Sequence, residues 1–339
     1  MNETILNPET EERPRIAVVM PCFGDSASAT RTIEELSNAY TPNVEIDVFV
    51  VNDRPFEPLT ITPDRSTPES GPKGFDVFCI ELTHNVGQQK AIAIGACYVA
   101  QYDYTHILLM DCDGEDNPEE AARMIRERSN KYTIVASRGK RNESKRFNAG
   151  YKAYKLLFSL FTGIEIDFGN FMILPIRHAR ELLSRETSWV HIAATLLRSG
   201  LPIKRVIIDR GVRYHGKSKM NFSKLIFLGL TATSIFSEMI VGRLFGLCQL
   251  LWAAFAIAVI YLFIKKIFYT SPLGWATLIS LQLLTLSTVS TLILLTFCCL
   301  LVWQKSQEYE SIQLNFNTFI RNVQSTTSKQ STCSSEGIA

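Results

Sequence analysis

The sequence predicts an α/β protein, in which a mostly parallel sheet precedes two membrane-spanning helices. Three observations support this prediction. β-rich runs alternate with helix-like segments from residue 15 onward, acidic or amide side chains follow the ends of these runs, and two long stretches near the C-terminal end carry no charge. Strands and helices that alternate at this spacing are typical of a parallel sheet covered by helices on both faces.

The four β-rich runs are followed in each case by polar or helix-forming residues; the runs are 16–20, 46–51, 77–82 and 106–110. Helices are expected around 27–40 and from Asn85-Val86-Gly87 to about residue 101. Residues 54–74 contain five prolines and predict a long surface loop. Asn117 is expected to cap a further helix, because Pro118 suits the first helical position and acids follow it.

Polar side chains stand directly after the predicted strands. Asp25, Asp53, Asn85 and Asp111 each follow a strand end. Ligands of such sheets bind beyond the carboxyl ends of the strands, so we expect these side chains to meet along one edge.

The acidic run 111–120 is the most informative local feature. It holds six acids and no base. Asp111 and Asp113 can both turn toward the edge, because Gly114 permits a break in the strand. Their hard oxygens suit Mg²⁺ or Mn²⁺ bridging a diphosphate. The run does not fit an EF-hand calcium loop, because it lacks the expected spacing to a Glu at the twelfth position. The remaining alternative is a solvated loop whose acids cap the following helix. The chain has neither a GxGxxG turn nor a GxxxxGK[ST] loop.

Two basic clusters follow, each with seven bases and one acid, at residues 138–155 and 204–224. Arg138 and Arg146 follow a strand end and begin a helix near the acidic edge, where a bidentate guanidinium suits a phosphate. The second cluster precedes the amphipathic stretch 222–241. There Lys217 and Lys224 are expected to attract anionic lipid headgroups.

Charge and hydropathy divide the chain. The formal net charge is +2, which excludes a strongly basic nucleic-acid-binding domain. Residues 1–243 carry 30 of the 35 Lys and Arg and 30 of the 33 acids. Residues 244–264 and 275–303 carry no charge, and about 20 helical residues span a bilayer. We therefore expect a transmembrane hairpin, with a pair of buried core helices as the alternative.

The start of the chain, residues 1–14, is polar and lacks an apolar signal region, which places the expected catalytic domain in the cytoplasm. The loop bases Lys265 and Lys266 oppose the positive-inside tendency. The eight cysteines form no CxxC pair, so reduced thiols are expected.

These features together also carry a resemblance. The motifs occur in order as Pro21-Cys22-Phe23-Gly24-Asp25, Val51-Asn52-Asp53, Asn85-Val86-Gly87-Gln88-Gln89-Lys90-Ala91, Asp111-Cys112-Asp113, Ser137-Arg138, Asp167-Phe168-Gly169-Asn170-Phe171 and Arg213-Tyr214-His215-Gly216-Lys217-Ser218-Lys219. Over residues 15–303 the chain resembles the polyprenyl-phosphate glycosyltransferases. These are membrane-anchored, inverting enzymes similar to dolichol-phosphate mannose synthase, with a Rossmann-like GT-A domain.

The resemblance implies a role for each matching residue. Asp111, Asp113 and Glu115 would hold Mg²⁺ or Mn²⁺, and Asp113 and Asp167 are the implied catalytic residues. Asp167 matches a proposed general base, although a phosphate monoester, with its second pKa near 6, hardly needs one. The nucleotide-sugar would be bound by Pro21, Phe23, Asp25, Asn52, Asp53, Asn85, Gly87, Lys90 and Asp111. The acceptor phosphate would be bound by Arg138, Arg141, Arg146, Arg213, Ser218 and Lys219.

The implied organisation is a polar tail at 1–14, a GT-A domain at 15–220, an amphipathic juxtamembrane segment at 221–243, two transmembrane helices, and a largely disordered tail at 304–339. The implied reaction moves a sugar from a UDP- or GDP-sugar to undecaprenyl or dolichyl phosphate. It would take place at the cytoplasmic face of a bacterial inner membrane. A homo-oligomer and a downstream flippase are further expected partners.

Two departures and two alternatives remain. Relatives usually have Asp-Asp-Gly-Ser where this chain has Asn52-Asp53-Arg54-Pro55, and an acidic residue usual near 190–198 is missing. A processive polysaccharide synthase shares the fold, but this chain lacks its Gln-x-x-Arg-Trp motif and its additional spans. A non-catalytic membrane scaffold is the other alternative, against which the intact acidic run argues.

Overall fold

The protein is described by a computed structural model. The structure describes residues 13–39, 43–57, 59, 61, 74–138, 158–160, 162–165, 167–209, 211–215, 229, 231–268, 274–307 and 315–325. The chain divides into two compact units. The first contains residues 1–143, 166–228 and 311–339, and the second contains residues 144–165 and 229–310.

The first unit is built on one eight-stranded sheet with the order β7-β5-β6-β4-β1-β2-β3-β8. Its strands are β1 (Arg15–Cys22), β2 (Glu45–Asn52), β3 (Phe75–Leu82), β4 (His106–Leu109), β5 (Thr133–Arg138), β6 (Phe168–Pro175), β7 (Ile203–Ile208) and β8 (Ile320–Ser325). The four strands expected from the sequence are therefore confirmed, with ends that differ by at most two residues.

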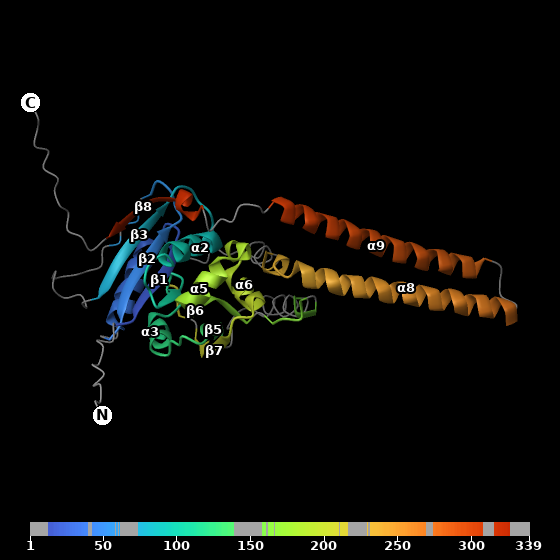
Figure 1. Cartoon of the computed structure of the whole chain (residues 1–339), viewed down its shortest axis with the longest axis horizontal. Coiled ribbons are helices and arrows are strands. Elements are labelled where there is room, and N and C mark those ends of the chain that lie inside the picture. The colour runs from blue at the N-terminus through green and yellow to red at the C-terminus, as the bar shows by residue number, and fades with distance from the viewer. Residues whose placement is uncertain are drawn as a thin grey trace, which may run out of the picture. The chain divides into compact units, whose positions relative to one another are not determined.

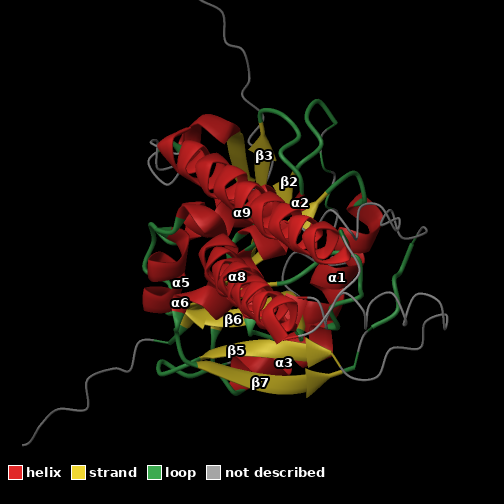
Figure 2. Cartoon of the chain, turned by 90° about the vertical axis from the view of Figure 1, so that its right-hand side faces the viewer, coloured by secondary structure: helices red, strands yellow, loops and turns green. Residues whose placement is uncertain are grey.

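Most neighbouring strands run in the same direction. β1 pairs in parallel with β2 and β4, β2 with β3, and β5 with β7. Figure 2 shows β5 and β7 side by side. β6 is antiparallel to β4 and β5, and β8 is antiparallel to β3. The predicted mostly parallel sheet is confirmed, and the two antiparallel strands bring their amino ends to the edge where the parallel strands end.

Helices cover both faces of the sheet because strand side chains alternate between them. Within β1, Ile16, Val18 and Met20 face one hydrophobic core, and Ala17 and Val19 face the other. The first core includes α1 (Ser26–Asn38) and α3 (Pro118–Arg126). The second includes α2 (Gln88–Val99), α5 (Ile176–Leu183), the short 3₁₀ helix η1 (Glu186–Trp189) and α6 (Ile192–Ser199).

The start of α3 forms as the sequence predicts. The Asn117 side chain accepts a hydrogen bond of 2.9 Å from the backbone N–H of Glu119, and Pro118 is the first helical residue. This cap fixes the residue, Asn117, at which the acidic loop ends and α3 begins.

The expectation of a largely disordered tail at 304–339 is wrong for residues 315–325. A 3₁₀ helix, η3 (Phe316–Phe319), leads into β8, which pairs with β3 and is drawn in red beside it in Figure 1. Phe316 is buried, and Phe319, Ile320 and Val323 pack against the core that contains α2. The polar average of the tail concealed these few apolar side chains. Residues 308–314 and 326–339 lie outside the described residues.

The second unit contains two long apolar helices, α8 (Ser237–Phe268) and α9 (Trp275–Gln307), which lie alongside each other in Figure 1. Trp252 Nε1 on α8 donates a hydrogen bond of 2.9 Å to Thr291 Oγ1 on α9. Both helices are long and apolar enough to span a membrane, and only 6% and 11% of their most apolar windows are buried. That exposure does not fit a pair of buried core helices.

The helices are longer than the predicted spans. Residues 237–243, expected in the juxtamembrane segment, belong to α8, because the helix continues without a break from Ser237. Residues 221–228 of the same segment lie outside the described part of the chain.

Candidate active site

Asp53 is a buried carboxylate at the carboxyl edge of the sheet, and it lies just beyond β2. It is 3% exposed, and its two oxygens accept hydrogen bonds from the backbone N–H groups of Val86 (2.7 Å) and Gly87 (2.9 Å). Asn85 Nδ2 donates 3.0 Å to the Asp53 carbonyl oxygen. Burial raises the pKa of Asp53, and the two backbone donors oppose that rise. The end of β2 is thereby joined to the loop that starts α2.

Asn52, Asp25 and Gly87 shape the loops of this edge. Asn52 Nδ2 donates 2.9 Å to the Glu57 carbonyl oxygen, and Asn52 Oδ1 accepts 3.1 Å from the N–H of Arg54. Asp25 caps α1 by accepting 3.3 Å from the N–H of Ser28. Gly87, at φ +85°, begins α2. Their predicted contacts with a nucleotide stay predictions, since these bonds join groups of the protein.

The other predicted nucleotide residues also lie at this edge. Pro21 belongs to β1 opposite Val51, and Phe23 follows β1 with 46% of its surface exposed. The Arg54 guanidinium lies 6.0 Å from the centre of the Phe23 ring. Lys90 is exposed in the first turn of α2. The edge that carries the buried Asp53 therefore also presents an aromatic ring, that of Phe23, and the basic side chains of Arg54 and Lys90.

Asp111 and Asp113 lie in the loop after β4. Asp111 Oδ1 accepts 2.8 Å from Gln88 Nε2, which ties the loop to α2. Asp113 Oδ1 accepts 2.9 Å from the N–H of Glu115. Gln88 belongs to the motif 85–91, in which only Asn85, Gly87 and Lys90 were given a role, and its place in that motif is the signal that could have identified it.

The acidic run contains no base of its own, but a base distant in sequence reaches it. Arg213 Nη2 lies 2.6 Å from Asp113 Oδ2, and Arg213 Nε lies 3.4 Å from Glu115 Oε1. Two backbone hydrogen bonds hold this segment on the acidic loop, from Gly211 N to Glu115 O (2.9 Å) and from Tyr214 N to Asp113 O (3.0 Å). Arg213, expected at the acceptor phosphate, here neutralises carboxylates of the acidic run.

Close approach of the two segments requires glycine. At Gly114, with φ +89°, a Cβ atom would lie 2.5 Å from the Tyr214 ring, and at Gly211 a Cβ atom would lie 2.1 Å from the Gly114 carbonyl oxygen. The Tyr214 hydroxyl donates to Glu35, and the Arg31 guanidinium lies 4.1 Å from the Tyr214 ring centre. Burial and this carboxylate raise the pKa of Tyr214.

The acidic loop fits a divalent cation in part. Within the described residues, no three His, Cys, Asp or Glu side chains form a metal-binding group, so the three-carboxylate set that includes Glu115 is not assembled. Mg²⁺ commonly takes only one or two carboxylates from the protein and its other ligands from phosphates and water. Asp111 and Asp113 suit that demand, and the Arg213 guanidinium beside Asp113 shows that this loop accepts a positive charge.

Asp167 lies at the same edge, because β6 is antiparallel and starts there. Its carboxylate lies 3.0 Å from Arg205 Nε and accepts a hydrogen bond of 3.1 Å from Ser137 Oγ. Sequence reasoning placed Arg205 only in a general basic cluster. The segment 203–208 does not alternate between polar and apolar residues, so the sequence carried no signal for the position of Arg205. Arg138 ends β5 beside Ser137. Arg141, Arg146, Ser218 and Lys219 lie outside the described residues.

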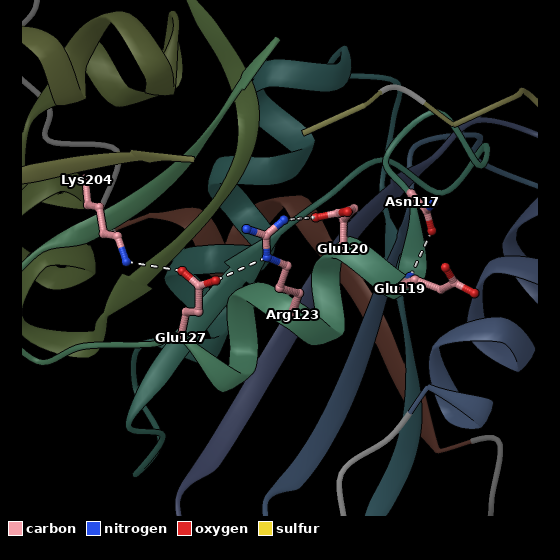
Figure 3. A network of polar contacts seen from close by, with 6 residues as sticks. All are labelled: Asn117, Glu119, Glu120, Arg123, Glu127 and Lys204. Atoms are coloured by element: carbon pink, nitrogen blue, oxygen red, sulfur yellow. Dashed lines mark hydrogen bonds and ion pairs between the residues drawn. The ribbon is translucent and has the colours of Figure 1, made fainter. Parts of the chain in front are cut away.

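A network of exposed polar contacts joins α3 to β7 (Figure 3). Arg123 contacts Glu120 at 3.3 Å and Glu127 at 3.1 Å, and Lys204 Nζ lies 3.1 Å from the same Glu127 carboxylate. Lys204, a member of the second basic cluster, is therefore an ion-pair partner within the first unit. Exposed pairs of this kind contribute at most about 1 kcal/mol each.

Comparison with known proteins finds glycosyltransferases among the similar sequences. Residues 17–183 match the family model described as glycosyl transferase family 2. A protein named undecaprenyl-phosphate 4-deoxy-4-formamido-L-arabinose transferase, from Yersinia enterocolitica, is 24% identical over 77% of this chain and 79% of its own length. An uncharacterized glycosyltransferase of Bacillus subtilis, YkoT, is 22% identical over 79% of this chain and 81% of its own. The solved structure of S. aureus TarS covers 67% of this chain and 69% of its own at 13% identity, with a TM-score of 0.35.

Proposed function

We propose that this chain, which carries a glycosyltransferase domain of family 2, transfers a sugar from a nucleoside diphosphate sugar to a polyprenyl phosphate at a membrane. The observation that carries the proposal is the common edge of Asp53, Asp111, Asp113 and Asp167, in a chain that also has two exposed apolar helices. Relatives whose names specify undecaprenyl phosphate support the choice of acceptor.

The donor would lie across the ends of β4, β1 and β2. Asp111 and Asp113 would hold Mg²⁺ or Mn²⁺ against its diphosphate, and the cation would neutralise charge on the leaving nucleoside diphosphate. Asp53 and Asn85, fixed to each other, would contact the nucleoside. In this arrangement the anomeric carbon would lie near the acidic loop, where the bond to the diphosphate would break.

The acceptor would lie toward β5, β6 and β7. A phosphate monoester is largely ionised at neutral pH, since its second pKa is near 6, and its oxygen can attack the anomeric carbon directly. Asp167 is already bound to Arg205 and Ser137. It suits the role of a residue that positions basic groups better than that of a proton acceptor. Attack from the side opposite the diphosphate would invert the configuration.

The fold supports an even number of membrane crossings. β8 pairs with β3, so residues 320–325 must lie on the same side of the membrane as the sheet. The chain leaves the first unit before α8 and returns to it after α9, which fits one crossing in each direction. We assign the sheet to the cytoplasmic face of a bacterial inner membrane, in line with the bacterial source of the named relatives.

A donor panel tests the proposal. The full-length chain in detergent is incubated with undecaprenyl or dolichyl phosphate, Mg²⁺ or Mn²⁺, and labelled UDP- and GDP-sugars. One donor should yield a labelled lipid carrying a single sugar, and omission of the divalent cation should remove it. A folded protein that yields no labelled lipid from any donor would count against the proposal. A product that lengthens with time would indicate a processive synthase, and no metal-dependent nucleotide binding would indicate a scaffold.

A further inference from the structure

The C-terminal strand β8 starts at the edge of the sheet that carries Asp53. Ile320 pairs with Leu82, the last residue of β3, and the backbone N–H of Thr83 donates 2.9 Å to the Phe319 carbonyl oxygen. Phe319 therefore lies beside Thr83 and His84, one residue before Asn85. Asn85 in turn contacts Asp53. A segment that follows α9 in the chain thus reaches the proposed donor site.

Packing fixes the position of this segment. The Phe319 ring lies 5.6 Å from the His84 ring and 6.3 Å from the Trp189 ring, and Phe316 is buried. An Arg321 guanidinium nitrogen approaches the Thr83 carbonyl oxygen at 3.5 Å. Arg321 lies at the register shift of the β3–β8 pairing, between Ile320 opposite Leu82 and Asn322 opposite Glu81, and its guanidinium reaches back to the end of β3.

Phe56 is the second unusual feature of this edge. Among the described residues it is the one non-glycine residue at positive φ, +68°, and its side chain is 84% exposed. Asn52 holds this turn through its bonds to Glu57 and Arg54. A bulky residue in the left-handed region, with its ring in solvent, is costly, and such residues concentrate at ligand sites. The Arg321 guanidinium lies over this ring, 4.6 Å from its centre.

Strand order places this pair at the far end of the proposed donor. From β4, which carries Asp111 and Asp113, the sheet continues through β1 and β2 to β3 and β8. Three strand spacings from β4 to β3 amount to about 14 Å. That span is comparable with the length of an extended nucleoside diphosphate. With the diphosphate at the acidic loop and the ribose near Asp53, the base reaches the turn of Phe56.

We propose that Phe56 and Arg321 form a stacking wall for the nucleobase of the donor. The inference rests on the proposed function and extends it to two residues outside the recognised motifs. A planar base stacks on an aromatic ring or a guanidinium plane, and this contact tolerates uracil and guanine alike. The C-terminal segment after the apolar hairpin then belongs to the donor site, and its Arg321 contacts the base, not the diphosphate.

Calorimetry on the full-length chain in detergent tests this wall. UDP and GDP are titrated with Mg²⁺ into the wild type, Phe56→Gly, Arg321→Ala and the control Gln324→Ala. Glycine suits the positive φ at position 56, so that variant removes the ring without adding strain. Gln324 is exposed on the same strand but pairs with Cys79, farther from the edge. Phe56→Gly and Arg321→Ala should each weaken binding of the preferred nucleotide about 5- to 20-fold, and Gln324→Ala should leave it within about twofold.

Two further measurements identify what Arg321 contacts. Uridine or guanosine should lose affinity in Arg321→Ala by the same factor as the diphosphate, and Arg321→Lys should not restore it, because an ammonium has no plane on which to stack. Loss of pyrophosphate binding in Arg321→Ala, restored by Lys, would overturn the assignment to the base. Binding of UDP or GDP that is unchanged in both variants would overturn the wall and leave the proposed function intact. A wild type that binds neither nucleotide would overturn the proposed function itself.

Discussion

Asp53 and Asp113 are the same residue type at the same edge of one sheet, yet the fold holds them in different ways. Asp53 is buried and accepts hydrogen bonds from two backbone N–H groups. Asp113 is partly exposed, accepts a hydrogen bond from one backbone N–H group, that of Glu115, and faces the side chain of Arg213, which comes from a distant segment. A backbone donor is fixed by the chain, whereas a side-chain cation can be replaced by another cation. We infer that Asp53 belongs to the framework of the edge and that Asp113 belongs to its exchangeable, reactive part.

The largest expected effect is the loss of sugar-transfer activity in Asp113→Ala, which distinguishes Asp113 from Asp53. Asp113→Ala should lower sugar transfer at least about 100-fold, equivalent to about 2.7 kcal/mol, because one ligand of the cation at the leaving diphosphate is lost. Its free energy of unfolding should fall by about 1–2 kcal/mol, because the N–H of Glu115 loses its acceptor while Arg213 keeps Glu115 as a partner. Initial rates and denaturant unfolding of the same preparation measure both. Transfer at the wild-type rate would remove Asp113 from the metal site.

Asp53→Ala should show the opposite pattern to Asp113→Ala: its main effect should be a loss of folding stability. The change leaves the N–H groups of Val86 and Gly87 without their acceptor, at a cost of about 2–4 kcal/mol in the free energy of unfolding. Asp53→Asn is the matched control, since its amide oxygen can retain one of the two bonds. A stability equal to that of the wild type in Asp53→Ala would contradict the framework role.

Acid should destabilise the start of α6, which lies on the face of the sheet that also carries α2. Burial lowers the pKa of His191 to about 4, and its Nδ1 accepts from the N–H of Ala194 at the start of α6. The neutral form is favoured in the folded state, so its stabilisation is present above pH 6.5 and is lost as the pH falls from about 6.5 to about 4. The full loss is about 3 kcal/mol.

His191→Asn can cap the helix without titrating in this range and should reduce that pH dependence. Unfolding midpoints at pH 7 and pH 4.5 measure it, with the exposed His215→Gln as a control. If His191→Asn kept the full pH dependence of the wild type, this histidine would not be its source.

Arg213→Ala should sharpen the contrast at the acidic loop. Without the guanidinium beside Asp113, Mn²⁺ binding should tighten about 3- to 10-fold, since a competing positive charge is removed from a partly exposed site. Electron paramagnetic resonance of free Mn²⁺ gives the affinity, and Arg31→Ala, at the neighbouring Tyr214 ring, is the control. Weaker Mn²⁺ binding in Arg213→Ala would show that Arg213 supports the metal site instead of competing with it.

The smallest effect should come from the exposed network of Figure 3. Arg123→Ala removes contacts with Glu120 and Glu127 and should cost about 0.5–1 kcal/mol of stability, without a change in transfer rate. High salt should reduce the difference from the wild type, because exposed pairs are screened. A tenfold loss of activity would show that α3 transmits strain to the acidic loop.

Much of this organisation was predictable from the sequence. Alternation of strands and helices predicted β1 to β4, and the charge-free stretches predicted α8 and α9, because both patterns are local. Asn117 with Pro118 predicted the start of α3 for the same reason. The tail was wrongly predicted, because η3 and β8 are stabilised by contacts with β3 and α2, which a local composition average does not contain.

The site divides in the same way. The sequence by itself determined which carboxylates follow strand ends, since in a parallel sheet that position sends them to one edge. Only the tertiary structure decided the partners of these carboxylates: backbone N–H groups for Asp53, Arg213 for Asp113 and Arg205 for Asp167. It also decided that Arg321 contacts Phe56. Three of these pairings join side chains from segments far apart in the chain. The physical reason is that an ion pair or a ring contact depends on separation in space, and strand order, not sequence distance, sets that separation.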